Sequence, residues 1–180
     1  MNKGAPALKK IVVMGPESSG KSTLCAALAA ALGTVWVQEY ARTYLEARGQ
    51  INILHEAELL AIAEGQLAAE DEAALHANGY LICDTDLHMV RIWGETIYNC
   101  CHRHILEAIA ARKYDSYLLA YPDIPWMPDP LRAYPDIKDR HHFYLQYLDT
   151  AQHSGLPFHI IKGTPEQRLV AALKAIAPNL

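Results

Sequence analysis

A glycine-rich segment near the start of the chain constrains the fold more than any other feature. It reads Gly15-Pro16-Glu17-Ser18-Ser19-Gly20-Lys21-Ser22 and fits the pattern G-x-x-x-x-G-K-[ST] at every fixed position. An apolar run at residues 11–14 precedes it, and an alanine-rich, helix-like stretch follows it. In that context the backbone N–H groups of the loop and the N-terminus of the helix converge on phosphate groups. The segment therefore predicts a nucleotide-binding protein.

Two side chains of this loop indicate the chemistry. In a loop of this pattern Lys21 reaches the β- and γ-phosphates, and Ser22 can ligate Mg²⁺. We therefore expect phosphoryl transfer or hydrolysis of a nucleoside triphosphate. The residues expected to bind the nucleotide here are Gly15, Glu17, Ser18, Ser19, Gly20, Lys21, Ser22 and Thr23.

Composition limits the remaining function classes. A chain of 180 residues with 51% apolar and 20% charged residues is predicted to form one domain, residues 1–180, with a well-filled core. The net charge of −4 and the lack of a Lys/Arg block argue against nucleic acid as a partner. Residues 1–10 lack the apolar core of a signal peptide, and the later apolar runs are shorter than a membrane span. We expect a cytoplasmic protein without a membrane partner.

The cysteines are expected to be reduced thiols. Cys25, Cys83, Cys100 and Cys101 include an adjacent pair, which has poor geometry for a mutual disulfide. The run Cys100-Cys101-His102-x-His104 gathers soft metal ligands but lacks C-x-x-C spacing. A half-buried helix start is therefore favoured there over a metal site.

Strand-like and helix-like stretches alternate along the chain. This alternation predicts an α/β sandwich around a parallel sheet. The strands are expected at residues 11–14, 35–38, 80–83, 116–120 and 158–161, and the helices at 21–32, 56–76, 105–113, 138–153 and 165–177. Thr164 as N-cap, Pro165 and Gln167 mark the start of the last helix.

The exception to this regularity is residues 121–135, which contain five prolines. Prolines at this density exclude a helix interior or a central strand, so we expect a long loop that serves as a lid, spanning about residues 121–140. It carries Trp126, Asp129, Arg132 and Arg140. An aromatic face can stack on a planar cationic ring, and arginines can close over a transferring phosphoryl group. Core packing of Trp126 is the alternative.

Carboxylates follow two of the expected strands, at the sheet edge where ligands of parallel sheets bind. Asp84 is the candidate for the Mg²⁺ shell, although Asp84 and Asp86 could instead cap the helix that begins near Leu87. Glu39 could accept the proton of an attacking hydroxyl or orient the sugar that bears it. The alternative for Glu39 is a surface ion pair with Arg42.

Together these motifs resemble the ribosylnicotinamide kinase domain of the NadR family, a branch of the P-loop kinases. The resemblance covers about residues 11–177. It is carried by Gly15-x-Glu17-Ser18-Ser19-Gly20-Lys21-Ser22, Glu39-Tyr40-Ala41-Arg42, Ile82-x-Asp84-Thr85-Asp86 and Trp126-x-x-Asp129-x-x-Arg132. It implies a three-layer P-loop kinase fold with a five-stranded parallel sheet of order 2-3-1-4-5. It also implies that ATP phosphorylates the 5′-hydroxyl of nicotinamide riboside. No H-x-G-H motif occurs, so we expect a stand-alone kinase domain.

The resemblance also suggests roles for individual residues, with ATP and Mg²⁺ as cofactors. The adenine of ATP is expected near Gly163, Thr164 and Pro165, because the loop after the last strand faces the same sheet edge as the phosphate loop. The catalytic set is Lys21, Glu39, Asp84, Arg132 and Arg140; the metal set is Ser22 and Asp84; the substrate set is Glu39, Tyr40, Arg42, Asp86, Trp126 and Asp129.

Two other functions stay open at this stage. The acceptor could be another nucleoside or nucleotide, since the acceptor pocket is the least constrained part of the sequence pattern. The chain could also be a nucleotide-sensing regulatory ATPase module that has no acceptor. A homo-oligomer is compatible with either reading, because the sequence does not fix the oligomeric state.

Overall fold

The computed structural model describes residues 7–49 and 55–178. The expectation that no leader segment occupies residues 1–10 therefore falls partly outside the described residues. The elements are β1 (Lys9–Met14), α1 (Lys21–Leu32), β2 (Trp36–Val37), α2 (Tyr40–Arg48), α3 (Glu56–Ala74), β3 (Tyr80–Asp84), α4 (Leu87–Tyr98), α5 (Arg103–Ala111), β4 (Ser116–Ala120), α6 (Ile137–His153), β5 (Phe158–Ile161) and α7 (Pro165–Ile176).

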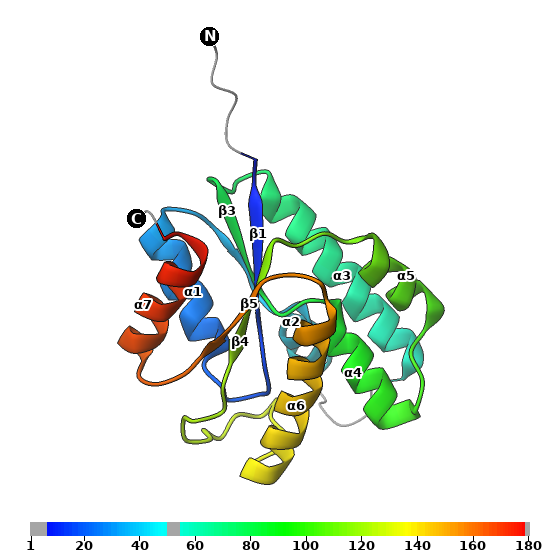
Figure 1. Ribbon diagram of the computed structural model, residues 1–180. Helices are drawn as coiled ribbons and strands as arrows, with labels where there is room; N and C mark the ends of the chain where they lie inside the picture. Colours follow the sequence, from blue (N-terminus) through cyan, green and yellow to red (C-terminus); the bar gives the residue numbers. More distant parts are fainter. Residues whose placement is uncertain (1–6, 50–54, 179–180) are drawn as a thin grey trace.

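The strands form one parallel sheet in the order β2-β3-β1-β4-β5, as predicted. Helices α1 and α7 cover one face, and α2 to α6 lie on the other, which gives three layers (Figure 1). Alternate residues of β1 supply both interfaces: Ile11 and Val13 belong to the core under α1 and α7, whereas Val12 and Met14 belong to the opposite core. A strand buried on both faces explains why residues 11–14 are apolar without alternation.

Several expected boundaries move. The second strand is only the pair Trp36–Val37, and α2 follows it at residues where no helix was predicted. Gly49 ends α2 with a φ of 70°, a left-handed conformation that suits glycine. Residues 121–136 contain no helix or strand, as the prolines predict, but residues 137–140 of the expected lid are the first turn of α6.

The expected helix starts and thiols are confirmed. Thr164 and Gln167 form a capping box at the start of α7, and His102 caps α5 by accepting a hydrogen bond from the backbone N–H of His104 at 3.2 Å. The cysteines are free, and burial raises the pKa of the Cys25 and Cys83 thiols. Within the described residues, no cluster of three or more His, Cys, Asp or Glu side chains could hold a metal ion. Among the described helices, none is long and apolar enough to cross a membrane.

Candidate active site

The phosphate loop joins β1 to α1 and needs glycine at two positions. Gly15 has a φ of 141°, and a Cβ there would lie 2.7 Å from the carbonyl oxygen of Ala120 on β4. Gly20, with a φ of 80°, is the N-cap of α1, and it carries no side chain to occupy the first N–H groups of the helix. The backbone therefore leaves the positive end of α1 open toward an anion.

Side chains brace this loop from inside and outside. Ser19 donates to the carbonyl of Pro16 at 2.7 Å, and the Lys21 ammonium donates to the same carbonyl at 3.0 Å. Arg140, predicted as part of the lid, is buried at the start of α6 and donates to the carbonyl of Ser18 at 3.4 Å. It also donates to the carbonyl of Ile124 at 3.2 Å, so from α6 it connects the phosphate loop to the proline-rich segment.

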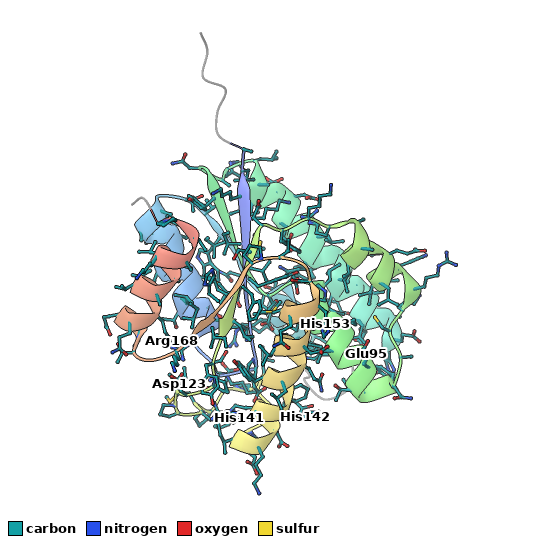
Figure 2. All side chains as sticks on the ribbon, in the orientation of Figure 1. Glu95, Asp123, His141, His142, His153 and Arg168 are labelled. Atoms are coloured by element: carbon teal, nitrogen blue, oxygen red, sulfur yellow. The ribbon has the colours of Figure 1, made fainter. Side chains whose placement is uncertain are left out.

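Arg168 and Asp123, which the sequence did not single out, connect three segments of the site. The Arg168 guanidinium is only 3% exposed and donates to the carbonyls of Ser19, Tyr121 and Gly163. It also pairs with the carboxylate of Asp123, which accepts from the N–H of Gly163 at 2.7 Å. The two labelled side chains lie at the same end of the sheet in Figure 2. The phosphate loop, the end of β4 and the loop after β5 are therefore held together by one buried cation.

A small apolar cavity lies beside this cation. Its volume is about 80 Å³, and it is lined by Gly20, Thr23, Leu24, Ala27, Ile124, Pro165 and Arg168. The cavity thus joins the phosphate loop to Pro165, as expected from the position of the last strand. An open groove of about 710 Å³ between α4 and α6, which includes Glu95 and His142 (Figure 2), contains none of the predicted site residues.

Asp84, at the end of β3, meets the phosphate loop. Its Oδ2 accepts a hydrogen bond from the Ser22 hydroxyl at 2.5 Å, and the side chain is 1% exposed. Burial raises the pKa of Asp84, although the positive charge of Lys21 opposes the shift. The other oxygen, Oδ1, is buried with no hydrogen-bond partner among the described residues. An unpartnered buried carboxylate oxygen beside a serine hydroxyl suits Mg²⁺, which takes few protein ligands and keeps several waters.

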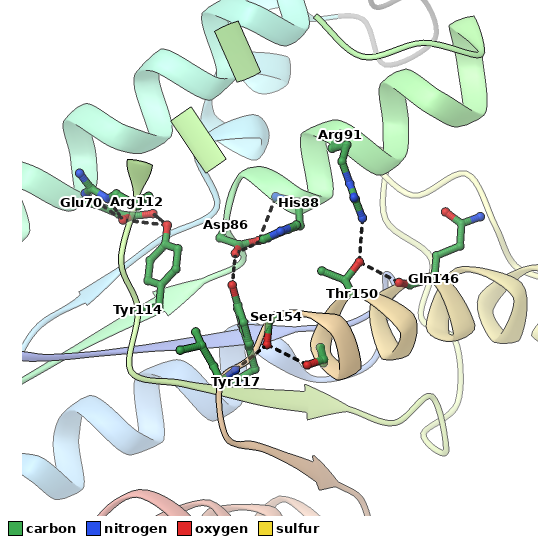
Figure 3. A network of polar contacts seen from close by, with 12 residues as sticks. Glu70, Asp86, His88, Arg91, Arg112, Tyr114, Tyr117, Gln146, Thr150 and Ser154 are labelled. Carbon is green, nitrogen blue, oxygen red and sulfur yellow. Dashed lines mark hydrogen bonds and ion pairs between the residues drawn. The ribbon is translucent and has the colours of Figure 1, made fainter. Parts of the chain in front are cut away.

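Asp86 lies two residues after Asp84, and its contacts stabilise the fold. It caps α4 by accepting from the backbone N–H of His88 at 3.0 Å, so the capping alternative is confirmed for Asp86. Its Oδ2 contacts Nδ1 of His88 at 2.8 Å and accepts from the Tyr117 hydroxyl at 3.1 Å (Figure 3). A second cluster in the same view joins Glu70, Arg112 and Tyr114. The contacts of Asp86 fix the turn that follows Asp84 at the end of β3.

Glu39 precedes α2 and is half-buried. Burial, followed by the negative charge of Asp84, raises its pKa to about 7, whereas the charge of Lys21 acts to lower it. The charges of Asp84 and Lys21 thus both act on the Glu39 carboxyl, in opposite directions. The alternative of a Glu39–Arg42 ion pair is wrong, because Arg42 pairs with Glu46 and with Asp129.

The neighbouring residues of α2 face different partners. The backbone N–H of Tyr40 donates to the side chain of Gln66 on α3, and the Tyr40 ring occupies the space where a Cβ on Gly65 would lie. Arg42 donates to Asp129 at 2.8 Å, and this hydrogen bond lowers the pKa of Asp129. Helix α2 is therefore linked to the proline-rich segment.

Residues 121–135 lie against the phosphate loop. Trp126 is half-buried and outside both core clusters, so core packing does not explain it. Its indole N–H donates to Glu17 at 3.1 Å, and the N–H of Met127 donates to the Ser18 hydroxyl at 3.1 Å. Arg132 donates to the carbonyl of Met127 within the same segment. The structure thus brings the expected lid residues Trp126 and Asp129 next to the phosphate loop and α2.

Comparisons with known proteins agree with this geometry. A protein family described as "AAA domain" matches residues 10–168 of this chain. The "Trifunctional NAD biosynthesis/regulator protein NadR" of Escherichia coli (strain K12) is 27% identical over 153 residues, which are 84% of this chain and 37% of that protein. The chain therefore spans little more than a third of this curated relative.

Two solved structures share the fold. A crystal structure of NadR protein in complex with NR has a TM-score of 0.72 and 24% identity, and one in complex with NAD and AMP-PNP has a TM-score of 0.70 and 23% identity. Each match covers 93% of this chain and 49% of the other. The resemblance to NadR and the P-loop kinase fold are thereby confirmed.

Proposed function

This chain belongs to the AAA domain family, and we propose that it is a kinase that uses ATP to phosphorylate the 5′-hydroxyl of nicotinamide riboside. The product would be nicotinamide mononucleotide. The observation that carries the proposal is the acidic sheet edge beside the phosphate loop: Asp84 accepts a hydrogen bond from Ser22, and the charges of Asp84 and Lys21 both act on the Glu39 carboxyl. A loop that only binds a nucleotide needs no carboxyl group for proton transfer beside it, whereas a kinase needs a group that takes the proton of its acceptor.

In this proposal ATP lies along the phosphate loop. Its phosphates accept hydrogen bonds from the loop backbone and from Lys21, and its adenine enters the apolar cavity between Ile124, Pro165 and Arg168. The buried Arg168 holds the carbonyl of Ser19, so it sets the shape of the loop rather than contacting the phosphates. Thr164 caps α7 beside the same cavity.

Ser22 and Asp84 would hold Mg²⁺, which supplies positive charge to the β- and γ-phosphates when bound. The 5′-oxygen of the riboside then forms a bond to the γ-phosphorus while the bond from that phosphorus to the β,γ-bridging oxygen breaks. The hydroxyl proton passes to Glu39, and ADP leaves. A carboxyl whose pKa is about 7 is a better proton acceptor than one of ordinary acidity.

The acceptor would lie between α2 and the proline-rich segment. An indole N–H lies in the plane of its ring, so the bond to Glu17 orients Trp126 without using the faces of the ring. One face can then stack on the pyridinium ring of nicotinamide riboside, whose fixed positive charge favours an aromatic surface. Tyr40, Arg42 and Asp129 would border the ribose, and Arg132 would close over the phosphates. The oxygens of Asp86 are engaged by His88 and Tyr117, so Asp86 would contribute by fixing its turn.

Production of ADP by the purified protein with Mg²⁺ and ATP tests the acceptor. We expect nicotinamide riboside to stimulate ADP formation, and uridine and thymidine to compete poorly. Trp126→Ala should raise KM for nicotinamide riboside about 2- to 30-fold through the loss of cation–π attraction, with a smaller effect on KM for ATP. Met127→Ala is the matched control, because the Met127 side chain is 62% exposed and its backbone contact to Ser18 would remain.

Each other result has a defined meaning. Preferential phosphorylation of uridine or thymidine would refute the nicotinamide assignment and leave a kinase of other nucleosides. ATP hydrolysis that no riboside stimulates would instead indicate a regulatory ATPase module. A Trp126→Ala variant with unchanged kinetics would remove the stacking role of Trp126.

Asp84→Asn tests the metal site. Asparagine keeps an oxygen for Ser22 but removes the negative charge that faces the cation, so turnover should fall. The Mg²⁺ concentration for half-maximal rate should rise by about 10-fold or more. A Mg²⁺ titration of the rate measures this shift, with Glu64→Gln as a control because Glu64 is an exposed carboxylate on α3. An unchanged titration would contradict the assignment of Asp84 to the metal.

A further inference from the structure

Glu17 of the phosphate loop is bonded to the proline-rich segment. Its Oε1 accepts from the indole N–H of Trp126 at 3.1 Å and from the backbone N–H of Tyr134 at 2.7 Å. Its Oε2 accepts from the backbone N–H of Ala133 at 3.0 Å. Three donors from two parts of one loop therefore converge on a single carboxylate. The sequence pattern leaves this position unspecified, so the binding of phosphate does not by itself require glutamate.

A carboxylate makes a poor ligand for ATP, because its negative charge repels the phosphates. Hydrogen bonds to a carboxylate are, however, stronger than bonds between neutral groups. The three N–H groups that donate to Glu17 all belong to residues 126–134. This segment carries Trp126, the proposed aromatic contact to the acceptor. The adjacent Ser18 adds a bond from the N–H of Met127. These contacts therefore connect the phosphate loop to the segment that would border the acceptor.

We propose that Glu17 is a positioning residue of the acceptor site and does not bind ATP. It holds Trp126 through the indole N–H and holds the turn at Ala133 and Tyr134 through the backbone. The loop that binds the phosphates thus also fixes the aromatic surface for the acceptor. The identity of that acceptor rests on the proposed function, whereas the attachment of the segment to Glu17 does not.

Amide hydrogen exchange in the full chain tests the attachment. In Glu17→Ala, the N–H groups of Ala133 and Tyr134 lose their acceptor, so their exchange should accelerate by about 10-fold or more. The N–H of Leu131, which donates to Asp129, should change less. The N–H of Thr85, which donates to Val13 across the sheet, should keep its wild-type rate and so verify the fold.

Two further variants sharpen the exchange measurement. Glu17→Gln keeps the side-chain length but turns an NH₂ group toward the donors, so it should give an intermediate acceleration and covers the case in which Glu17→Ala does not fold. Asp139→Asn is the charge control, because Asp139 is exposed at the start of α6 and its negative charge acts on Tyr134. It should leave the exchange of Ala133 and Tyr134 unchanged.

Kinetics then separate the two possible roles of Glu17. The Glu17 variants should raise KM for nicotinamide riboside about 10-fold while the Kd for AMP-PNP changes less than about 3-fold. Unchanged exchange at Ala133 and Tyr134, or a loss of AMP-PNP affinity as large as the rise in KM, would overturn the proposal. If the wild type leaves nicotinamide riboside unphosphorylated, the proposed function fails alone, and the exchange rates still decide for or against Glu17.

Discussion

Replacement of Lys21 by alanine is expected to lower kcat by about 10²- to 10³-fold while the protein stays folded. The Lys21 ammonium projects from the first turn of α1 and, in the structure, donates to the carbonyl of Pro16 on the same loop. In the proposed complex it turns to the β- and γ-phosphates, where a charged donor stabilises the negative charge of the transition state. Steady-state ADP production measures the loss, and circular dichroism checks the fold.

The same variant makes a second, independent prediction. The charge of Lys21 lowers the pKa of Glu39 and of Asp84, so its removal should move both pKa values further upward. Any residual activity should therefore need a higher pH than the wild type needs. Lys113→Ala, which removes an exposed lysine beyond α5, serves as the control. Near-normal turnover of Lys21→Ala would refute the assignment of the phosphate loop.

The elements that rest on local pattern were predictable. The loop at residues 15–22 has fixed residue types because a Cβ on Gly15 would lie 2.7 Å from the carbonyl oxygen of Ala120 and because Gly20 adopts a positive φ. The apolar strands follow from burial on both faces of the sheet, and the start of α7 follows from its capping box. Each of these constraints selects residue types within one short stretch of sequence, even where its cause is distant, as Ala120 is for Gly15, so the local pattern was enough to predict the feature.

Contacts between distant residues were not predictable in the same way. Arg168 lies on α7, 149 positions from the Ser19 carbonyl that it holds, and its acceptors are mostly backbone oxygens that carry no sequence signal. Glu17 was recognised as part of the loop, but its three donors come from residues 126–134, and two of them are backbone N–H groups. Helix α2 was missed because only Ala41 and Leu45 of its nine residues are buried, so its apolar periodicity is weak. The signals that remained were Arg48 in its last turn and Gly49 after it.

The pH dependence of the reaction tests Glu39. Its pKa is raised to about 7 by burial, so the carboxyl is largely protonated below that pH and largely ionised above it. Only the ionised form can take the proton of the acceptor hydroxyl. For the wild type, kcat/KM for nicotinamide riboside should therefore rise with pH through about 7 and then level off, since kcat/KM reports the free enzyme.

Glu39→Gln removes the proton acceptor and retains the size and polarity of the side chain. We expect kcat to fall by about 10²- to 10⁴-fold, and the rise of kcat/KM near pH 7 to disappear. Glu64→Gln, on the exposed side of α3, should keep both the wild-type rate and its pH profile. Glu39→Asp shortens the carboxylate, so it should keep a pH-dependent limb at a reduced rate. If Glu39→Gln kept the wild-type rise of kcat/KM near pH 7, another group would be responsible for that rise. Asp84→Asn would then be measured, because burial also raises the pKa of Asp84. A lower rate with an unchanged pH dependence of kcat/KM would mean that Glu39 orients the ribose and that the proton leaves by another route.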